Sequence, residues 1–214
     1  MGLRRSSYDL TVSDSLELRD AWRVCFESAW EAFRAGTIPV GAAVARADGV
    51  IVARGRNRTF DPPGHGLSGS RLAHAEVDAL AQLPTTERHP DHVLYSTLEP
   101  CLFCVAATLH SGVGRIEYAA ADPFGGGCVG MIDTPHWRRS APEIAELREG
   151  WWAGRLSAAL QSAFWQEHSE RPSAVEIIEA FGEEARAAGR RIVERGATLP
   201  AEFEDALPHL VDAL

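Results

Sequence analysis

Apolar residues recur at helical spacing near the start of this chain. Between residues 16 and 33 they return every three or four positions, which predicts an amphipathic helix. Ser13 or Asp14 is suited to cap its first turn, and Gly36 is typical of a helix end. We therefore expect the chain to open with a helix that buries one face.

The pattern then changes to short β-rich segments. Residues 39–46 and 50–54 are small or β-branched and flank Asp48-Gly49, a pair that favours tight turns. This arrangement predicts a β-hairpin directly after the first helix.

Helix and strand patterns alternate further along the chain. Residues 70–80 have apolar positions at helical spacing, and residues 92–98 form a short apolar run typical of a buried strand. Pro100 suits the first position of a helix that ends at Gly112. Residues 114–120 predict another strand, followed by a glycine-rich loop.

The last third of the chain has a different character. We expect helices over residues 142–147, 151–168, 173–194 and 201–214, the third opening with a capping-box pattern from Ser173. We divide the chain into a catalytic domain, residues 1–140, and a helical C-terminal extension, residues 141–214. The added helices are expected to dock on the core, form a dimer contact or cover the active site.

Two short motifs carry metal-binding chemistry, HAE at residues 74–76 and PCLFC at residues 100–104. His74, Cys101 and Cys104 offer one imidazole and two thiolates, which fill three positions of a tetrahedral zinc ion. The fourth position stays open for water, as in catalytic zinc sites. We therefore predict a catalytic Zn²⁺ cofactor.

Glu76 lies two positions after His74, so it can reach the site without binding the metal. It is predicted to act as the catalytic acid and base that moves protons between water and substrate. A redox pair or a structural zinc site is the alternative, but neither explains the carboxylate. A structural site also needs a fourth ligand, for which four residues are available: Cys25, Cys128, His65 and His110.

These motifs identify a resemblance. Residues 38–127 are similar to the cytidine deaminase superfamily, and the run TLEPCLFCVAATLHSGVGRIEYAAADPFGG is most similar to its tRNA adenosine deaminase and guanine deaminase branch. The resemblance implies an α/β fold, a three-layer α-β-α sandwich with a mixed sheet of about five strands. It also implies the roles given above to the metal ligands and to Glu76, and a homodimer with pockets near the interface.

The resemblance also indicates where substrate binds. Asn57 stands at the place of a family asparagine that contacts the base, although an asparagine there also suits a turn. Val40, Gly41 and Ala42 are expected to form the pocket floor, but close strand packing is another reason for small residues. Two residues beside the motif ligands complete the predicted substrate-binding set, Ala75 and Pro100.

Charge and composition narrow the choice of substrate. The net charge of -9 opposes a polyanion. Basic residues gather only weakly, at Arg54, Arg56 and Arg58 and at Arg138 and Arg139. The 214 residues contain four cysteines and no apolar run near the roughly 18 residues that span a bilayer. We expect a cytoplasmic protein without a membrane segment.

The sequence therefore predicts a zinc-dependent deaminase. It would convert an amino group on a nucleobase, nucleoside or related amino-heterocycle to a carbonyl, using water and releasing ammonia. The alternative is a tRNA-specific adenosine deaminase, which changes adenosine to inosine in the anticodon loop. The loop at residues 61–70 is longer than in typical tRNA enzymes, and we expect specificity to differ there.

Overall fold

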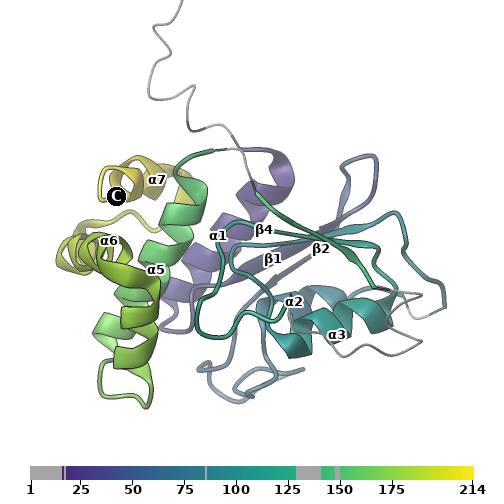
Figure 1. Cartoon of the computed structure of the whole chain (residues 1–214), viewed down its shortest axis with the longest axis horizontal. Coiled ribbons are helices and arrows are strands. Elements are labelled where there is room, and N and C mark those ends of the chain that lie inside the picture. The colour runs from purple at the N-terminus through teal and green to yellow at the C-terminus, as the bar shows by residue number, and fades with distance from the viewer. Residues whose placement is uncertain (1–15, 17, 85, 129–140, 148–149) are drawn as a thin grey trace, which may run out of the picture.

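The core of the molecule is a five-stranded mixed sheet, shown in the computed structural model of Figure 1. The structure describes residues 16, 18–84, 86–128, 141–147 and 150–214. The strand order is β2-β1-β3-β4-β5; β1 is antiparallel to β2 and β3, whereas β3, β4 and β5 are parallel. The strands are β1 (Gly41–Ala45), β2 (Ile51–Arg56), β3 (Val93–Ser96), β4 (Arg115–Tyr118) and β5 (Glu143–Glu146).

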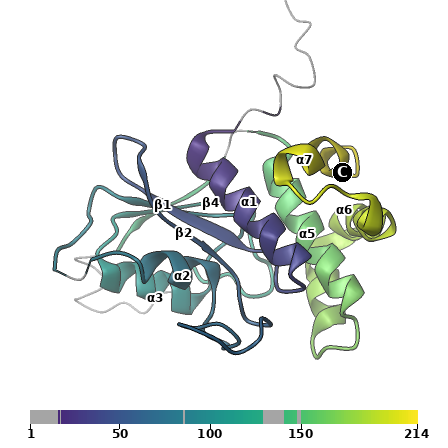
Figure 2. The ribbon, with the colours of Figure 1, turned by 180° about the vertical axis from the view of Figure 1, so that it is seen from behind.

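Helices cover both faces of this sheet, which confirms the predicted three-layer α/β fold. One face carries α1 (Asp20–Arg34) and α5 (Ala153–Glu167), and the other carries α2 (Ala75–Leu80) and α3 (Leu102–Ser111). Figure 2 shows α1 lying along the sheet on the side opposite α2 and α3.

The side chains of β1 alternate between the two layers. Ala43 and Ala45 pack in the same core cluster as Trp22, whereas Ala42 and Val44 pack in the cluster that contains the α2 and α3 residues. This alternation follows from the two-residue period of a strand. All five residues of β1 are buried, as expected of a central strand that is covered on both sides.

The predicted β-hairpin is confirmed, with a turn at Asp48 and Gly49. Gly49 has a φ of 84°, a conformation that residues with a side chain rarely adopt. The Asp48 carboxylate accepts a hydrogen bond from the Val50 N–H. The turn residues and the β-rich segments on either side of them therefore both favour the observed hairpin.

The first helix begins later than its apolar pattern predicts. It starts at Asp20, with Arg19 at the N-cap position, rather than at residue 16. The proposed caps Ser13 and Asp14 lie outside the described residues. Gly36 does follow the helix with a φ of 71°, as predicted for its end.

The predicted helix over residues 142–147 is wrong, because this segment forms β5. The Glu143 N–H bonds to the Gly114 carbonyl, and the Leu147 N–H bonds to the Tyr118 carbonyl. An ion pair joins Arg115 to Glu143 at 2.5 Å. Pairing with β4 thus outweighs the helix preference of these residues.

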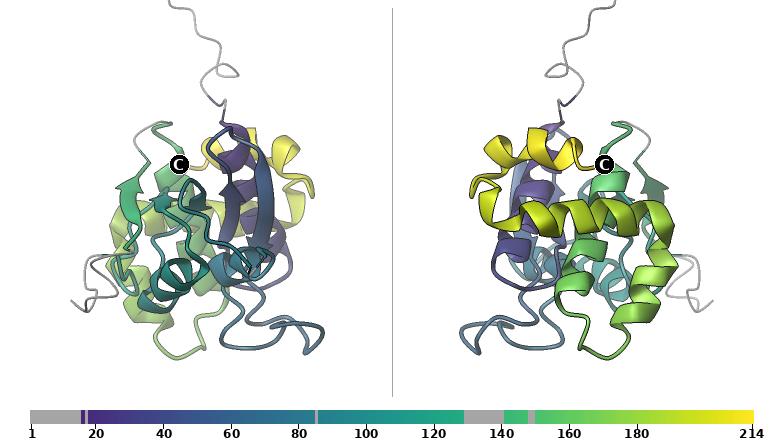
Figure 3. Two further views of the ribbon diagram at one scale, coloured as in Figure 1. Left: turned by 90° about the vertical axis from the view of Figure 1, so that its right-hand side faces the viewer. Right: turned by 90° about the vertical axis from the view of Figure 1, so that its left-hand side faces the viewer.

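Three helices complete the chain: α5, α6 (Ala174–Arg195) and α7 (Phe203–Val211). The right-hand view of Figure 3 shows α6 running across α5. The predicted capping box is absent, because Ser173 adopts a left-handed φ of 64° and its side chain makes no cap hydrogen bond. A kink with non-helical geometry lies at Gly182.

The division of the chain at residue 140 stays a prediction. β5 completes the sheet after this point, and α5 shares a core cluster with α1. In the part of the chain that the structure describes, no helix has the length and apolar content needed to cross a membrane.

Candidate metal centre and substrate cavity

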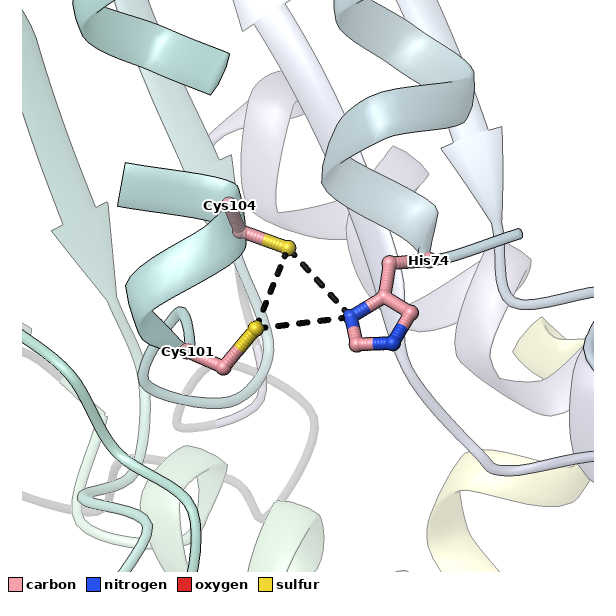
Figure 4. Close-up of side chains that lie close together, drawn as sticks. All are labelled: His74, Cys101 and Cys104. Carbon is pink, nitrogen blue, oxygen red and sulfur yellow. Dashed lines mark hydrogen bonds between the residues drawn. The ribbon is translucent and has the colours of Figure 1, made fainter. Parts of the chain in front are cut away.

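Three side chains from two motifs meet at one point, as Figure 4 shows. The Nδ1 atom of His74 lies 3.6 Å from the sulfur of Cys101 and 3.3 Å from the sulfur of Cys104, and the two sulfurs are 3.7 Å apart. Within the described residues, these three donor atoms lie close enough together to hold a metal ion.

Two helix N-termini place these donors. His74 is the N-cap residue of α2, and Cys101 is the N-cap residue of α3, whose first turn contains Cys104. Pro100 therefore precedes the cap and is not the first helical residue, which corrects its predicted position. Two helix starts thus meet at the motifs, and their positive dipole ends favour thiolates there.

The donor spacing fits zinc. Bond lengths of about 2.3 Å to sulfur and about 2.0 Å to nitrogen, at tetrahedral angles, require about 3.8 Å between sulfurs and about 3.5 Å between sulfur and nitrogen. The three observed separations match these values closely. His74, Cys101 and Cys104 therefore form a zinc-binding set with room for one further ligand.

The pKa values of the two thiols are shifted in opposite directions. Hydrogen bonds from Cys104 and from His74 lower the pKa of Cys101 to about 4, although burial opposes this shift. The same contact with Cys101, together with burial, raises the pKa of Cys104 well above its ordinary value. The Cys101 hydrogen bond also raises the pKa of His74. The contact between the two thiols thus favours the thiolate at Cys101 and the protonated thiol at Cys104.

Glu76 lies beside the donors and is 4% exposed. Its Oε1 atom accepts a hydrogen bond from the Ser96 hydroxyl at 3.1 Å, and its Oε2 atom lies 3.4 Å from the Cys104 sulfur. Burial raises the pKa of Glu76, with His74 acting in the opposite direction. The carboxylate is therefore fixed by one oxygen and faces the metal centre with the other.

A cavity of about 300 Å³ opens on this centre. Its lining is mainly apolar with a few polar groups, which is typical of small-molecule sites. Five of the predicted site residues line it: Val40, Asn57, His74, Glu76 and Cys101.

Asn57 is held in one orientation. Its Oδ1 atom accepts hydrogen bonds from the Thr37 hydroxyl at 3.0 Å and from the Thr59 N–H at 2.9 Å. Within the described residues, its Nδ2 atom has no acceptor assigned. Because the oxygen is already used, the amide presents a donor to the cavity.

The remaining predicted substrate contacts do not line the cavity: Gly41, Ala42, Ala75 and Pro100. Gly41 faces α1, because an added Cβ would lie 2.0 Å from the Cys25 carbonyl oxygen. Helix packing therefore explains this glycine. Ala42 and Ala75 are fully buried in the core cluster on the α2 side of the sheet. Substrate roles for these four residues stay predictions.

The C-terminal helices contribute side chains that no motif predicts. Gln161 and Trp165 from α5 and Ile177 and Phe181 from α6 line the cavity. Three roles are predicted for the C-terminal extension, and the place of these four side chains in the cavity lining corresponds to one of them, covering the active site. The adjacent aromatic residues Phe164 and Trp165 are the sequence feature that points to this wall of the cavity. The packing of α5 decides which of the two rings lines it, and that ring is Trp165.

Two further carboxylates belong to the cavity wall, one between β3 and α3 and one at the start of the glycine-rich loop. Glu99 and Asp122 both line the cavity. The Glu99 carboxylate accepts hydrogen bonds from the backbone N–H groups of Asp122 and Cys128, and so anchors the loop. Together with Glu76, they make this wall acidic.

Comparison with known proteins places the chain in a family. Residues 17–120 match the model of the cytidine and deoxycytidylate deaminase zinc-binding region. A tRNA-specific adenosine deaminase of Bacillus subtilis is 30% identical over 154 residues, which are 69% of this chain and 88% of that protein. The chain belongs to the cytidine and deoxycytidylate deaminase zinc-binding family.

Other proteins to which the chain is similar differ from it in length. A tRNA(Ile)-lysidine synthase of Deinococcus radiodurans is 40% identical over 105 residues, and the match spans 47% of this chain but only 17% of that protein. A structure from a study of A-to-I editing by tRNA:A34 deaminases is 29% identical with a TM-score of 0.51, covering 59% of this chain and 96% of that one. The family model ends at residue 120, so α5, α6 and α7 lie outside the region that it matches.

Proposed function

We propose that this protein is a zinc-dependent hydrolytic deaminase of a nucleobase, nucleoside or related amino-heterocycle. The position of Glu76 carries the proposal. A buried carboxylate with one oxygen fixed by Ser96 lines the same cavity as His74 and Cys101. A purely structural zinc site has no use for such a group.

The reaction joins water to the amine-bearing carbon and releases ammonia, leaving a carbonyl. When bound, zinc lowers the pKa of water toward neutrality, which supplies the nucleophile. Glu76 accepts a first proton from water at Oε2 and passes it to a ring nitrogen. It then accepts the remaining proton of the hydroxyl group added to the ring carbon and gives it to the departing amine, so that the carbonyl forms as ammonia leaves. The fixed Oε1 keeps the carboxylate aimed at the reacting atoms throughout.

The chain's own residues orient the ring. The Nδ2 donor of Asn57 suits a carbonyl oxygen or an unprotonated ring nitrogen. Val40 lies on the β1 side of the cavity, whereas Trp165 and Phe181 cover it from the C-terminal helices. These apolar walls exclude water around a flat heterocycle. Ala42, Ala75, Pro100 and Gly41 would support this shape from behind.

The charges favour a small substrate over RNA. Of the predicted basic clusters, Arg138 and Arg139 lie outside the described residues. Each arginine of the other cluster is paired with a carboxylate: Arg54 with Glu31, Arg56 with Asp61 and Arg58 with Asp78. These guanidinium groups are therefore not free to neutralise a row of phosphates.

A tRNA-specific adenosine deaminase is the second candidate. The name of the Bacillus subtilis relative supports it, since the chain covers most of that protein's length. The enzyme would have to take a base out of an RNA loop into the cavity. The paired arginines speak against this candidate, and the substrate test below separates the two.

We also propose a homodimer whose interface lies beside the site. Four large apolar side chains are exposed on the segments that carry the metal ligands and the glycine-rich loop: Leu72, Leu102, Phe103 and Phe124. A second copy would cover such a surface. The four cysteines are free thiols, which supports the proposed cytoplasmic location.

Ammonia release by the zinc-loaded protein tests the function. We would assay adenine, guanine and cytosine, their nucleosides, amino-substituted pterins and triazines, and a tRNA anticodon stem-loop, with Glu76→Gln as the matched control. Turnover of a small heterocycle that falls by about a hundredfold or more in Glu76→Gln is expected. Turnover of the RNA alone would favour the second candidate, and full activity of Glu76→Gln would contradict the mechanism.

A further inference from the structure

A second hollow of about 600 Å³ adjoins the substrate cavity. Ile38, His74 and Trp165 line both spaces and form the boundary between them. The remaining lining of the hollow comes from the loop before α2 and from the turn between α5 and α6: Thr59, Phe60, Gly69, Arg71, Arg171, Pro172 and Ser173. A ligand with its ring at the metal centre can therefore extend into this hollow.

The two spaces have opposite charge. Among the residues that the structure describes, Arg71 and Arg171 line the hollow and no carboxylate does, although the chain carries a net charge of -9. The substrate cavity, in contrast, is lined by Glu76, Glu99 and Asp122. A ligand that spans both would carry its negative group at the arginine end.

Neither arginine is neutralised. Among the described residues, Arg71 forms no ion pair. Of the carboxylates in the described part of the chain, Arg171 pairs only with that of Glu170, at 3.9 Å, and the Glu170 side chain is 72% exposed. The Arg171 guanidinium lies 3.7 Å from the centroid of the Phe60 ring, which fixes its plane beside the hollow.

Two buried polar atoms of this hollow lack hydrogen-bond partners. In the described part of the chain, six buried side-chain nitrogen or oxygen atoms are unpaired, and Nε of Arg171 and Oγ1 of Thr59 are two of them. Unpaired buried groups of this kind are uncommon because each costs about 1–3 kcal/mol. Both are hydrogen-bond donors, so an acceptor with several oxygens would satisfy them together.

We propose that the hollow binds the phosphate of a nucleoside monophosphate whose base lies at the metal centre. This inference rests on the proposed function and narrows its substrate class to nucleotides. The guanidinium fork matches phosphate oxygens, and the Thr59 hydroxyl donates one more hydrogen bond. The start of α6, next to Ser173, adds a positive helix end on the same side.

Binding measurements test the proposal without turnover. Isothermal titration calorimetry on the full chain would use inorganic phosphate alone, and then adenosine and AMP, guanosine and GMP, and cytidine and CMP, with Glu76→Gln keeping the ligands unreacted. Arg171→Gln and Thr59→Val each remove one phosphate contact from a different element. Arg190→Gln is the matched control, because Arg190 is an exposed arginine of α6 paired with Glu183.

We expect at least one monophosphate to bind about tenfold or more tightly than its nucleoside, and Arg171→Gln to reduce this ratio toward one. Thr59→Val should reduce it by a smaller factor, and Arg190→Gln should leave it unchanged. Equal affinity of every nucleoside and monophosphate pair, or a ratio that survives both variants, would overturn the proposal. A short RNA that binds more tightly than every monophosphate, with the same dependence on Arg171, would overturn the mononucleotide assignment in favour of an RNA phosphate.

The two proposals fail separately. Absence of ammonia release across the panel extended with AMP, GMP and CMP, with phosphate still bound through Arg171, would contradict the deaminase function. If each nucleoside and its monophosphate are deaminated and bound equally well, the phosphate site alone would be contradicted.

Discussion

The Ser96 hydroxyl donates a hydrogen bond to Oε1 of Glu76 at 3.1 Å, and both side chains are buried. Ser96 ends β3, whereas Glu76 lies in the first turn of α2, so the sheet itself orients the carboxylate. Ser96→Ala should reduce turnover by about tenfold while zinc content stays unchanged. Loss of one buried hydrogen bond should lower the free energy of unfolding by about 1 kcal/mol.

The control for Ser96→Ala is Ser162→Ala, a buried serine of α5 whose hydroxyl accepts a hydrogen bond from Gln166. Steady-state ammonia release and zinc analysis should separate the two variants, because Ser162 does not contact Glu76. Equal turnover in both would show that Ser96 does not position the carboxylate.

A second prediction concerns metal binding. Cys104→Ser should lower the zinc content well below one ion per chain, because only His74 and Cys101 remain as strong donors. It should also remove the loss of thermal stability that a chelator causes in the wild type. Elemental analysis and melting curves with and without chelator would measure both effects.

Cys128→Ser is the matched control for this prediction. The Cys128 thiol lies 3.8 Å from the Pro100 carbonyl and does not belong to the donor group. The Cys128→Ser protein should keep one zinc ion per chain and should still lose thermal stability when the chelator is added. A Cys104→Ser protein that still binds one zinc ion per chain would contradict the assigned ligands.

The metal centre could be predicted from sequence because its determinants are local. His74 and Glu76 are two positions apart, and Cys101 and Cys104 are one helical turn apart, so each motif fixes its own geometry. The relative placement of the two motifs follows from the order of strand and helix along the chain. The resemblance to a known family added the layer arrangement.

The parts that were missed depend on distant packing. The segment that forms β5 has no strand pattern of its own and becomes a strand by pairing with β4. Gly41 looks like a pocket residue in sequence, but the backbone of α1 lies against it. Gln161 and Trp165 reach the cavity only because α5 packs against the sheet.

Gly41 provides a third prediction. In Gly41→Ala the new methyl group would lie 2.0 Å from the Cys25 carbonyl oxygen and 2.5 Å from the Ala29 backbone nitrogen. The strand and α1 would have to separate, which should lower the free energy of unfolding by about 3 kcal/mol or more. Urea denaturation would measure this loss.

Gly196→Ala is the control, because no atom lies within 4 Å of the position of its added Cβ. It should change the stability far less than Gly41→Ala does. If both variants unfold at the same urea concentration, close packing of β1 against α1 is not the reason for Gly41.

A fourth prediction concerns alkaline pH. Cys25 is fully buried, its thiol donates a hydrogen bond to the Tyr95 carbonyl, and burial raises its pKa well above the ordinary value. The unfolded chain releases this proton near its usual pKa of about 8.5, whereas the folded chain keeps it. The contribution to stability is therefore fully present below about pH 8.5 and is lost as the pH rises through the range above it.

Cys25→Ala removes this titration. Between pH 7 and pH 10 the wild type should lose about 2 kcal/mol more unfolding free energy than the variant, since one group contributes about 1.4 kcal/mol per pH unit above its unfolded pKa. Urea denaturation at both pH values, with a reductant to keep the thiols free, would give the difference. Any cavity left by the smaller side chain lowers the stability at both pH values and cancels in this comparison. Equal losses in the two proteins would mean that the folded thiol ionises as readily as the unfolded one, which its position between α1 and the sheet should prevent.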